Sequence, residues 1–326
     1  MSEWRFWLKE QRGTLTAVGI FLVMFTIYVS NHPAGLTANV VQTASNKGVL
    51  LAFVAMAQTL VVITAGIDLS VGMIFILTNA LASWLVIGSP LETSFGVVAV
   101  LAAGLACGAL NGLIVIYGRL QPIVATIATG AVFFGIALLL RPFPGGSVNE
   151  DLADIMTGKI FGVVPSSLVA LVAVILVVWV PFSRSVIGRA AYATGSSEIA
   201  AYMSSLPIRR AKFTAYLLSG LLAATGGLFL TFFTYTGEAA LASGNAYTLF
   251  SIASVVLGGV SLFGGRGTAI GAVFGALAFR TIGDLLFVFD FDPLWQPLFQ
   301  GVVLLVAVSL GAFGLFRVRN RLEWFG

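Results

Sequence analysis

The sequence predicts an all-α, polytopic membrane protein with about ten transmembrane helices and with both termini in the cytoplasm. Three observations lead to this prediction. Hydrophobic residues make up 59% of the 326 residues and charged residues only 9%, whereas soluble domains carry about 25% charged residues. The apolar residues gather in runs long enough to cross a bilayer. The basic residues collect between alternate runs, which is typical of cytoplasmic loops.

The apolar runs define the expected helices, because a helix needs about 20 mainly apolar residues to cross the hydrocarbon core. Ten runs qualify, in chain order 14–30, 48–66, 70–88, 94–117, 122–140, 166–182, 213–234, 246–263, 268–288 and 295–315. The ninth is the weakest, since it contains Arg280 and Asp284, which are four residues apart and can pair on one helix. We expect residues 1–326 to form a single membrane domain, because no polar segment is long enough to fold alone.

The basic residues give the orientation of these runs. With the N-terminus inside, 13 of the 17 Lys and Arg residues fall on the cytoplasmic side: Arg5, Lys9, Arg12, Arg119, Arg184, Arg189, Arg209, Arg210, Lys212, Arg266, Arg317, Arg319 and Arg321. Lys47, Arg141 and Lys159 fall outside, and Arg280 lies within a run. Because both ends are basic, the number of crossings is even. Ten crossings fit the charges better than eight, which would require two re-entrant runs.

The composition argues against several other classes of protein. The single cysteine, Cys107, cannot form an internal disulfide. One cysteine and one histidine, His32, cannot supply the three or four ligands of a zinc site. The net charge of +4 does not indicate nucleic-acid binding, because the basic residues lie in short loops rather than in one patch. We expect membrane lipid around the chain and no bound metal, cofactor or nucleic acid.

The sequence also lacks the usual motifs of an enzyme. It has no G-x-x-x-x-G-K-[ST] phosphate loop and no G-x-S-x-G nucleophile motif. Any ATP-driven activity must therefore draw on a partner. Glycines recur every four residues in two runs, at Gly104, Gly108 and Gly112 and at Gly267, Gly271 and Gly275. This spacing favours close helix packing in lipid, with a hinge as the alternative interpretation.

A loop over residues 183–212 contains a short amphipathic segment on the predicted cytoplasmic side. Ser196 or Ser197 can cap the start of a helix, and Glu198 suits its positive first turn. Apolar residues follow at helical spacing: Ile199, Met203 and Leu206. Pro207 disfavours continuation of the helix. Such a helix either lies on lipid or docks into a groove on a cytoplasmic partner.

Two glycine-rich turns lie on the same predicted side. The first covers residues 64–72, where Asp68 can cap the following helix through the free amides at its N-terminus. The second covers residues 257–268. Ionisable groups near membrane depth usually mark function. Asp68 is therefore a functional candidate, with capping alone as the alternative.

Four segments resemble, in order, characteristic blocks of the ribose/xylose/galactose class of ABC sugar permeases. Residues 66–72 (Gly-Ile-Asp-Leu-Ser-Val-Gly) look like the signature of that class. Residues 111–114 with 121–126 are similar to its next block, 195–201 to its cytoplasmic coupling segment and 256–268 to a fourth block. In the coupling segment the family more often has Asn in the middle and Gly before the final apolar part. The resemblance covers about residues 45–315.

The resemblance implies the membrane-spanning permease subunit of a sugar importer in the bacterial inner (plasma) membrane. Two permeases, identical or different, would pair there. A periplasmic sugar-binding protein would deliver the sugar and set most of the selectivity. Two ATP-binding cassette subunits would hydrolyse ATP on the cytoplasmic side and drive alternating access.

The resemblance also implies roles for particular residues. The ATPase-coupling helix would comprise Gly195, Ser196, Ser197, Glu198, Ile199, Ala200, Tyr202, Met203 and Leu206. The turns of the family motifs would comprise Gly66, Asp68, Ser70, Gly72, Gly258, Gly259, Gly264, Gly265, Arg266 and Gly267.

A sugar path needs polar groups in a mostly apolar channel. The polar residues inside the runs that can line it are Gln58, Asn79, Asn111, Thr126 and Thr129. The alternative is that they form hydrogen bonds between helices. Aromatic residues near the predicted outer face, Phe143, Tyr235, Tyr247 and Trp295, either line the path or anchor the interface.

Other transport functions compete with this interpretation. A branched-chain amino acid ABC permease has a similar overall plan. An ion-coupled secondary transporter usually needs an acidic residue at mid-membrane, and only Asp284 comes near that position. A channel leaves the loop over residues 183–212 unexplained.

Overall fold

The computed structural model describes residues 11–306 and 309, and it is mainly helical. The long apolar helices are α2 (Arg12–Asn31), α3 (Ala38–Val62), α4 (Val71–Leu85), α5 (Pro90–Gly112), α6 (Pro122–Leu140), α8 (Ser166–Val174), α12 (Ile208–Thr234), α13 (Leu241–Leu257) and α14 (Ala269–Val288). Two π-helical segments, η1 (Leu113–Tyr117) and η2 (Ile175–Trp179), extend α5 and α8. The last helix covers Pro293–Val306 and opens with the 3₁₀ turn η3 (Pro293–Trp295).

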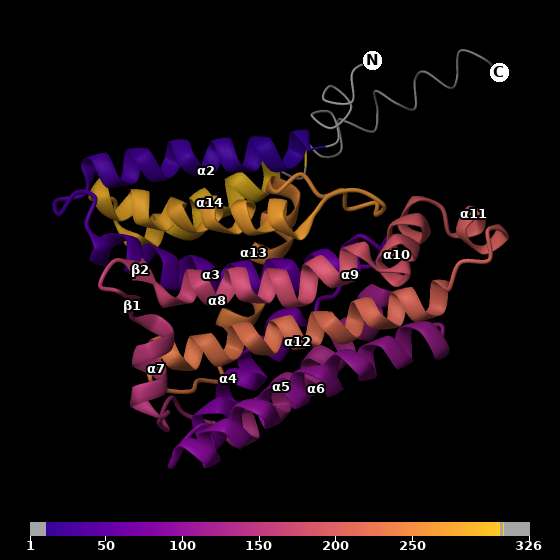
Figure 1. The fold of residues 1–326 in the computed structure, drawn as a ribbon, viewed down its shortest axis with the longest axis horizontal. Helices are drawn as coiled ribbons and strands as arrows, with labels where there is room; N and C mark the ends of the chain where they lie inside the picture. The colour runs from indigo at the N-terminus through magenta and orange to yellow at the C-terminus, as the bar shows by residue number, and fades with distance from the viewer. Residues whose placement is uncertain (1–10, 307–308, 310–326) are drawn as a thin grey trace.

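The shorter elements lie at the two ends of the bundle (Figure 1). Helix α7 (Glu150–Thr157) and the antiparallel pair β1 (Lys159–Ile160) and β2 (Val164–Pro165) lie at one end. Helix α9 (Val180–Arg184) leads to α10 (Val186–Ser196) and α11 (Glu198–Met203) at the opposite end. We call these the α7 end and the α11 end. The positive-inside rule predicts that the α11 end is the cytoplasmic one.

Helix α3 lies at the centre of the bundle and is almost entirely buried. It packs against α12, α14, α13 and α8, and α12 in turn packs against α5 and α4. Helix α2 contacts α14, at the edge of the bundle drawn at the top of Figure 1. The peripheral helices α2, α5 and α6 leave large apolar side chains exposed, as expected for surfaces that face lipid rather than water.

The glycine repeats account for the closest helix contacts. A Cβ at Gly108 of α5 would come 2.3 Å from the Tyr216 carbonyl oxygen of α12, and one at Gly220 of α12 would come 2.1 Å from the Gly104 carbonyl oxygen. A Cβ at Gly275 of α14 would come 2.1 Å from the Ser254 carbonyl oxygen of α13. Any side chain at these positions would push the helices apart, so the repeats serve close packing.

Each of the ten predicted runs overlaps a helix. Seven helices have the length and hydropathy to cross a membrane, counting α5 with η1 and α8 with η2 and α9 as single rods. The other three runs correspond to shorter apolar helices, Val71–Leu85, Leu241–Leu257 and Pro293–Val306. The prediction of a polytopic helical membrane protein is therefore confirmed. The terminal basic residues that set the orientation of both ends, Arg5, Lys9, Arg317, Arg319 and Arg321, lie outside the described residues.

Helix α3 begins ten residues before the predicted run, at residue 38 instead of residue 48. Its polar first turns are stabilised within the protein, because Gln42 and Asn46 both donate to the Thr157 carbonyl at 2.8 Å. The Ser167 hydroxyl of α8 donates to the other side of the Asn46 amide at 2.6 Å. Hydropathy alone does not reveal such partners.

The same shift corrects the placement of Lys47. We predicted Lys47 in an outer loop and a pair between Arg280 and Asp284 on one helix. Lys47 instead lies inside α3, and its Nζ is 3.3 Å from Asp284 Oδ1 on α14. Arg280 forms no ion pair with any described residue. The Lys47–Asp284 pair joins α3 to α14, because the two side chains meet where these helices face each other.

Candidate functional site

The turn between α3 and α4 is built around Asp68, which is completely buried. Its Oδ1 accepts two hydrogen bonds from Ser70, one from the backbone N–H at 2.9 Å and one from the hydroxyl at 2.6 Å. In this Asx-type turn, the side chain bonds the backbone two residues further on. Ser70 directly precedes α4. Asp68 therefore fixes the start of α4 through Ser70, and not through the amides of the first helical turn as expected.

Ser70 connects this turn to two other helices. The Asn111 side chain at the end of α5 donates to the Ser70 hydroxyl at 2.7 Å, and Thr129 of α6 donates to Asn111 Oδ1 at 2.6 Å. The Thr126 hydroxyl accepts from the Leu69 N–H at 2.9 Å. These contacts bring together the first two sequence blocks, which are distant in the chain. We call Asp68, Ser70, Asn111, Thr126 and Thr129 the polar network.

Three buried oxygen atoms beside this network lack a hydrogen-bond partner among the described residues. They are Oδ2 of Asp68 and the hydroxyls of Tyr216 and Ser219, both on α12. Burial raises the pKa of the Asp68 carboxyl. The hydrogen bonds from Ser70 oppose this rise, as does the nearby Ser219 hydroxyl, although the latter makes no hydrogen bond of ordinary geometry. Burial thus favours the neutral acid, whose proton can serve as a donor.

The five candidate path residues are all buried. Three of them belong to the polar network. Asn79 of α4 donates to the Thr231 hydroxyl of α12 at 2.8 Å and accepts from the Glu238 N–H at 2.8 Å. Four of the five therefore hold neighbouring segments together. Gln58 of α3 differs, because neither polar atom of its side chain has a partner among the described residues.

The second glycine-rich turn lies against the end of α3. The Gly265 N–H donates to the Ile63 carbonyl at 3.0 Å. The turn needs left-handed backbone, which glycine adopts without the steric cost of a Cβ. Its positive φ angles are at Gly259, Gly264, Gly265 and Gly267. The side chain of Arg266 is exposed.

The other glycines of the predicted motif turns lie where backbones approach closely. A Cβ at Gly72 would come 2.0 Å from the Gly244 carbonyl oxygen of α13. One at Gly258 would come 2.4 Å from the Gly271 carbonyl carbon of α14. At Gly66 the space is less restricted, with the nearest side-chain atom 3.0 Å away. Gly72 and Gly258 thus set how closely α4, α13 and α14 pack.

The last turn of α10 meets both of these regions. A Cβ at Gly195 would come 2.0 Å from the Ile63 carbonyl oxygen and 2.5 Å from the Gly265 nitrogen. The Tyr192 hydroxyl donates to the Gly267 carbonyl at 2.6 Å. We call Ile63, Gly195 and Gly265 the glycine junction. Sequence reasoning missed Ile63 and Tyr192, because only the glycines hinted at a close contact here.

The predicted amphipathic helix forms as two helices. Gly195 and Ser196 end α10, and Ser197 starts α11 by accepting the Ala200 N–H at 3.3 Å. The Glu198 carboxylate is paired with Lys212 of α12 at 2.7 Å. The chain leaves the helix after Met203 and enters α12 at Ile208. Helix α11 therefore projects from the bundle at its far end (Figure 1).

Three large apolar side chains of α11 face outward. The exposed fractions are 75% for Ile199, 77% for Tyr202 and 79% for Met203. Leu206, which we placed on the same face, turns inward and packs against the core. The exposed apolar face therefore consists of Ile199, Tyr202 and Met203, and we call it the apolar tip.

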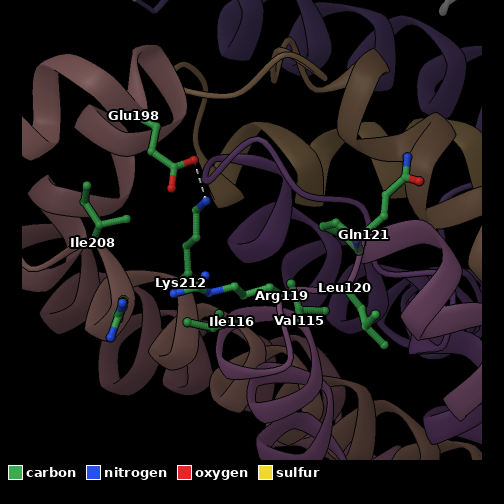
Figure 2. Close-up of a pocket in the computed structure, with 10 residues that line it drawn as sticks. Val115, Ile116, Arg119, Leu120, Gln121, Glu198, Ile208 and Lys212 are labelled. Carbon is green, nitrogen blue, oxygen red and sulfur yellow. Dashed lines mark hydrogen bonds and ion pairs between the residues drawn. The ribbon is translucent and has the colours of Figure 1, made fainter.

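A pocket of about 490 Å³ lies beside α11 (Figure 2). Its walls come from η1, the turn before α6, α11 and the start of α12. Three basic residues line it, Arg119, Arg209 and Lys212. The sequence placed all three on the cytoplasmic side. It did not show that they line one pocket, because Arg119 is distant in the chain from Arg209 and Lys212.

The chain matches the family model described as the permease component of the branched-chain amino acid transport system, over residues 40–308. The chain belongs to this permease family. It is 31% identical to the ribose import permease of Bacillus subtilis (strain 168), over 90% of this chain and 90% of that protein. It is 32% identical to the ribose import permease of Escherichia coli (strain K12), over 93% of each. No solved structure matched the chain.

A fructose import permease of Rhizobium meliloti is also similar, at 30% identity over 80% of this chain and 74% of that protein. The family match begins inside α3, so it covers the polar network, the glycine junction and α11, but not α2. The membership confirms the expected resemblance to a family of import permeases. This permease is a multi-pass membrane protein and a transport component rather than a catalytic one.

Proposed function

We propose that this permease is the membrane-spanning subunit of an ATP-driven importer for a monosaccharide. The observation that carries the proposal is the apolar tip on α11, which stands exposed at the predicted cytoplasmic end of a buried helical bundle. Exposed apolar side chains on a short helix are typical of a helix that fits a partner's groove. The partner is an ATP-binding cassette subunit, which hydrolyses the ATP that this chain does not bind.

The sugar substrate is inferred from the relatives. The family description names branched-chain amino acids, whereas similar permeases are named for ribose and fructose. The four sequence blocks also resemble the sugar class. A periplasmic sugar-binding protein would deliver the substrate to the α7 end, and a second permease, identical or different, would complete the path.

The membrane arrangement belongs to the same proposal. We propose ten crossings with both termini in the cytoplasm, and the seven long and three shorter apolar helices support this number. Gln58 is the path candidate with free polar atoms among the described residues. An ion-coupled mechanism is disfavoured, because Asp284, its acidic candidate, is already paired with Lys47.

The test begins with purification of the permease from its native membrane in mild detergent, with identification of the proteins that accompany it. We expect an ATP-binding subunit and a sugar-binding protein. The purified complex in proteoliposomes is then supplied with ribose, fructose or leucine, with and without internal ATP. ATP-dependent uptake of a sugar supports the proposal. Uptake of leucine instead, or uptake driven by an ion gradient without ATP, contradicts it.

A further inference from the structure

The pocket beside α11 carries more positive charge than its own residues neutralise. Arg119, Arg209 and Lys212 line it with one carboxylate, Glu198. Lys212 pairs with Glu198, whereas Arg119 and Arg209 form no ion pair within the described part of the chain. Figure 2 shows the Arg119 side chain reaching from the turn before α6 towards α12, beside Lys212. Because these positive charges line one pocket, an anion in it would be stabilised.

A second hollow adjoins the first and shares Glu198, Ile208 and Arg209 with it. It has a volume of about 510 Å³ and is lined by Tyr202, Leu206, Arg209 and Arg210 among others. Arg209 lies between the two hollows and lines both. Tyr202 of the apolar tip therefore lines the same hollow as the exposed residues Arg209 and Arg210. An apolar centre with a charged rim is the usual composition of a protein docking surface.

The shape of this region favours a protein partner over lipid. Basic and apolar residues together also suit an anionic membrane surface. However, α11 has only six residues, and the arginines line hollows that a flat lipid surface would not fill. The helix also projects along the direction of the long helices, away from the sides of the bundle (Figure 1).

We propose that the ATP-binding subunit inserts acidic side chains into the pocket between Arg119 and Arg209, while its apolar groove receives the apolar tip. This inference rests on the proposed function and names the chemistry of the partner's surface. The Glu198–Lys212 pair then has a positioning role, because it holds α11 against α12 and leaves the two arginines free. The partner is expected to carry Asp or Glu at the rim of its docking groove.

The test uses the complete complex, immobilised through the permease and washed with rising NaCl. Charge-reversal variants Arg119→Glu and Arg209→Glu, singly and together, are compared with Arg119→Gln and Arg209→Gln, and with Arg184→Glu as a control. Arg184 is exposed and basic but lines neither hollow. Size-exclusion profiles confirm that each variant folds. The measured quantity is the NaCl concentration that releases half of the ATP-binding subunit.

We expect the double reversal to weaken binding of the ATP-binding subunit by roughly tenfold or more, so that less NaCl releases half of it. The glutamine variants should weaken this binding less, and Arg184→Glu should behave as the wild type. Equal retention in all variants overturns the inference, as does an equal loss in Arg184→Glu. A charge reversal that leaves the ATP-binding subunit bound but reduces the phosphatidylglycerol that co-purifies with the permease would also overturn it and indicate a lipid contact. If no ATP-binding subunit accompanies the wild type at all, the proposed function itself has failed.

Discussion

Asp68 is a buried carboxyl held by one neighbour. Both of its hydrogen bonds come from Ser70 and end on Oδ1, which leaves Oδ2 without a partner among the described residues. An unpartnered buried charge is costly, and the raised pKa of this carboxyl reflects that cost. An asparagine would keep the acceptor for Ser70 and remove the charge. Asp68→Asn therefore tests whether this residue has only a structural role or is needed as a carboxylate.

The stability of the folded permease should depend on pH through the ionisation of Asp68. The folded pKa of Asp68 lies above its ordinary value of 3.8, so the folded state holds the proton more tightly than the unfolded state. Its contribution to stability is thus fully present below that value and is lost as pH rises through the folded pKa. Asp68→Asn should abolish this loss. Thermal unfolding of the detergent-solubilised permease across pH measures the difference.

The difference in melting temperature between Asp68→Asn and the wild type distinguishes the possible roles of Asp68. At alkaline pH the melting temperature of Asp68→Asn should equal or exceed that of the wild type. Glu92→Gln should instead lower it, because the Glu92 carboxylate accepts from Ser89 in a capping box at the start of α5. A lower melting temperature for Asp68→Asn at alkaline pH would contradict the prediction. If Asp68→Asn is stable but transports no sugar, the carboxylate is needed for transport rather than for folding.

Asn111 occupies a different position, between two partners. It donates to Ser70 and accepts from Thr129, so it joins the first turn to α5 and α6. The variants Asn111→Ala, Thr129→Val and their combination form a double-mutant cycle. We expect a coupling of about 1 kcal/mol in the free energy of unfolding, as for other hydrogen bonds between membrane helices. Additive effects in chemical denaturation would show that the bond contributes nothing.

At the scale of elements, α11 is held by a local hydrogen bond at its start and by the Glu198–Lys212 pair. The Ser197 hydroxyl accepts the Ala200 N–H, and proline at position 200 would remove that donor. Ala200→Pro should abolish sugar uptake and leave insertion intact, whereas Ala200→Ser keeps the N–H and should transport. Glu198→Arg should act in the same way by replacing the pair with Lys212 by repulsion. Uptake and membrane content are measured together, and normal uptake by Ala200→Pro would show that α11 does not couple.

The glycine junction links α10 to the end of α3. Gly195→Ala would place a methyl group 2.0 Å from the Ile63 carbonyl oxygen, so α10 must move. We expect the complex to assemble and hydrolyse ATP while sugar uptake falls at least about tenfold, the change that 1.4 kcal/mol produces. Gly19→Ala is the matched control, because nothing lies within 4 Å of its added Cβ. Equal uptake by both variants would show that the junction tolerates movement.

At the scale of the whole molecule, the α7 end and the α11 end should lie on opposite sides of the membrane. The single cysteine, Cys107, is buried, so Cys107→Ser provides a background for labelling. Phe161→Cys, at a side chain that is 96% exposed beside β1, should react with an impermeant maleimide from outside. Tyr202→Cys, in permease expressed without its ATP-binding subunit, should react only in inverted vesicles. Labelling of both from the same side would contradict the proposed topology.

Much of the fold could be predicted from the sequence because lipid acts on each segment separately. Every backbone polar group in hydrocarbon must be satisfied within its own helix, so each apolar run of sufficient length overlaps a helix of the described residues. The errors came where polar residues bond across helices. The polar start of α3 was taken for a loop, because its partner Thr157 is far away in the chain. Lys47 was assigned outside for the same reason, since its partner is Asp284.

The sequence by itself determined the class of the protein, its helical segments, the asymmetry of charge and the short helix after Ser197. These depend on composition, periodicity and local capping, which act over a few residues. Only the tertiary structure decided that Asp68, Asn111 and Thr129 form one network, that Gly195 meets Ile63 and Gly265, and that Arg119 and Arg209 line one pocket. Those arrangements depend on how helices pack against one another, and that packing is set by contacts between residues distant in the chain.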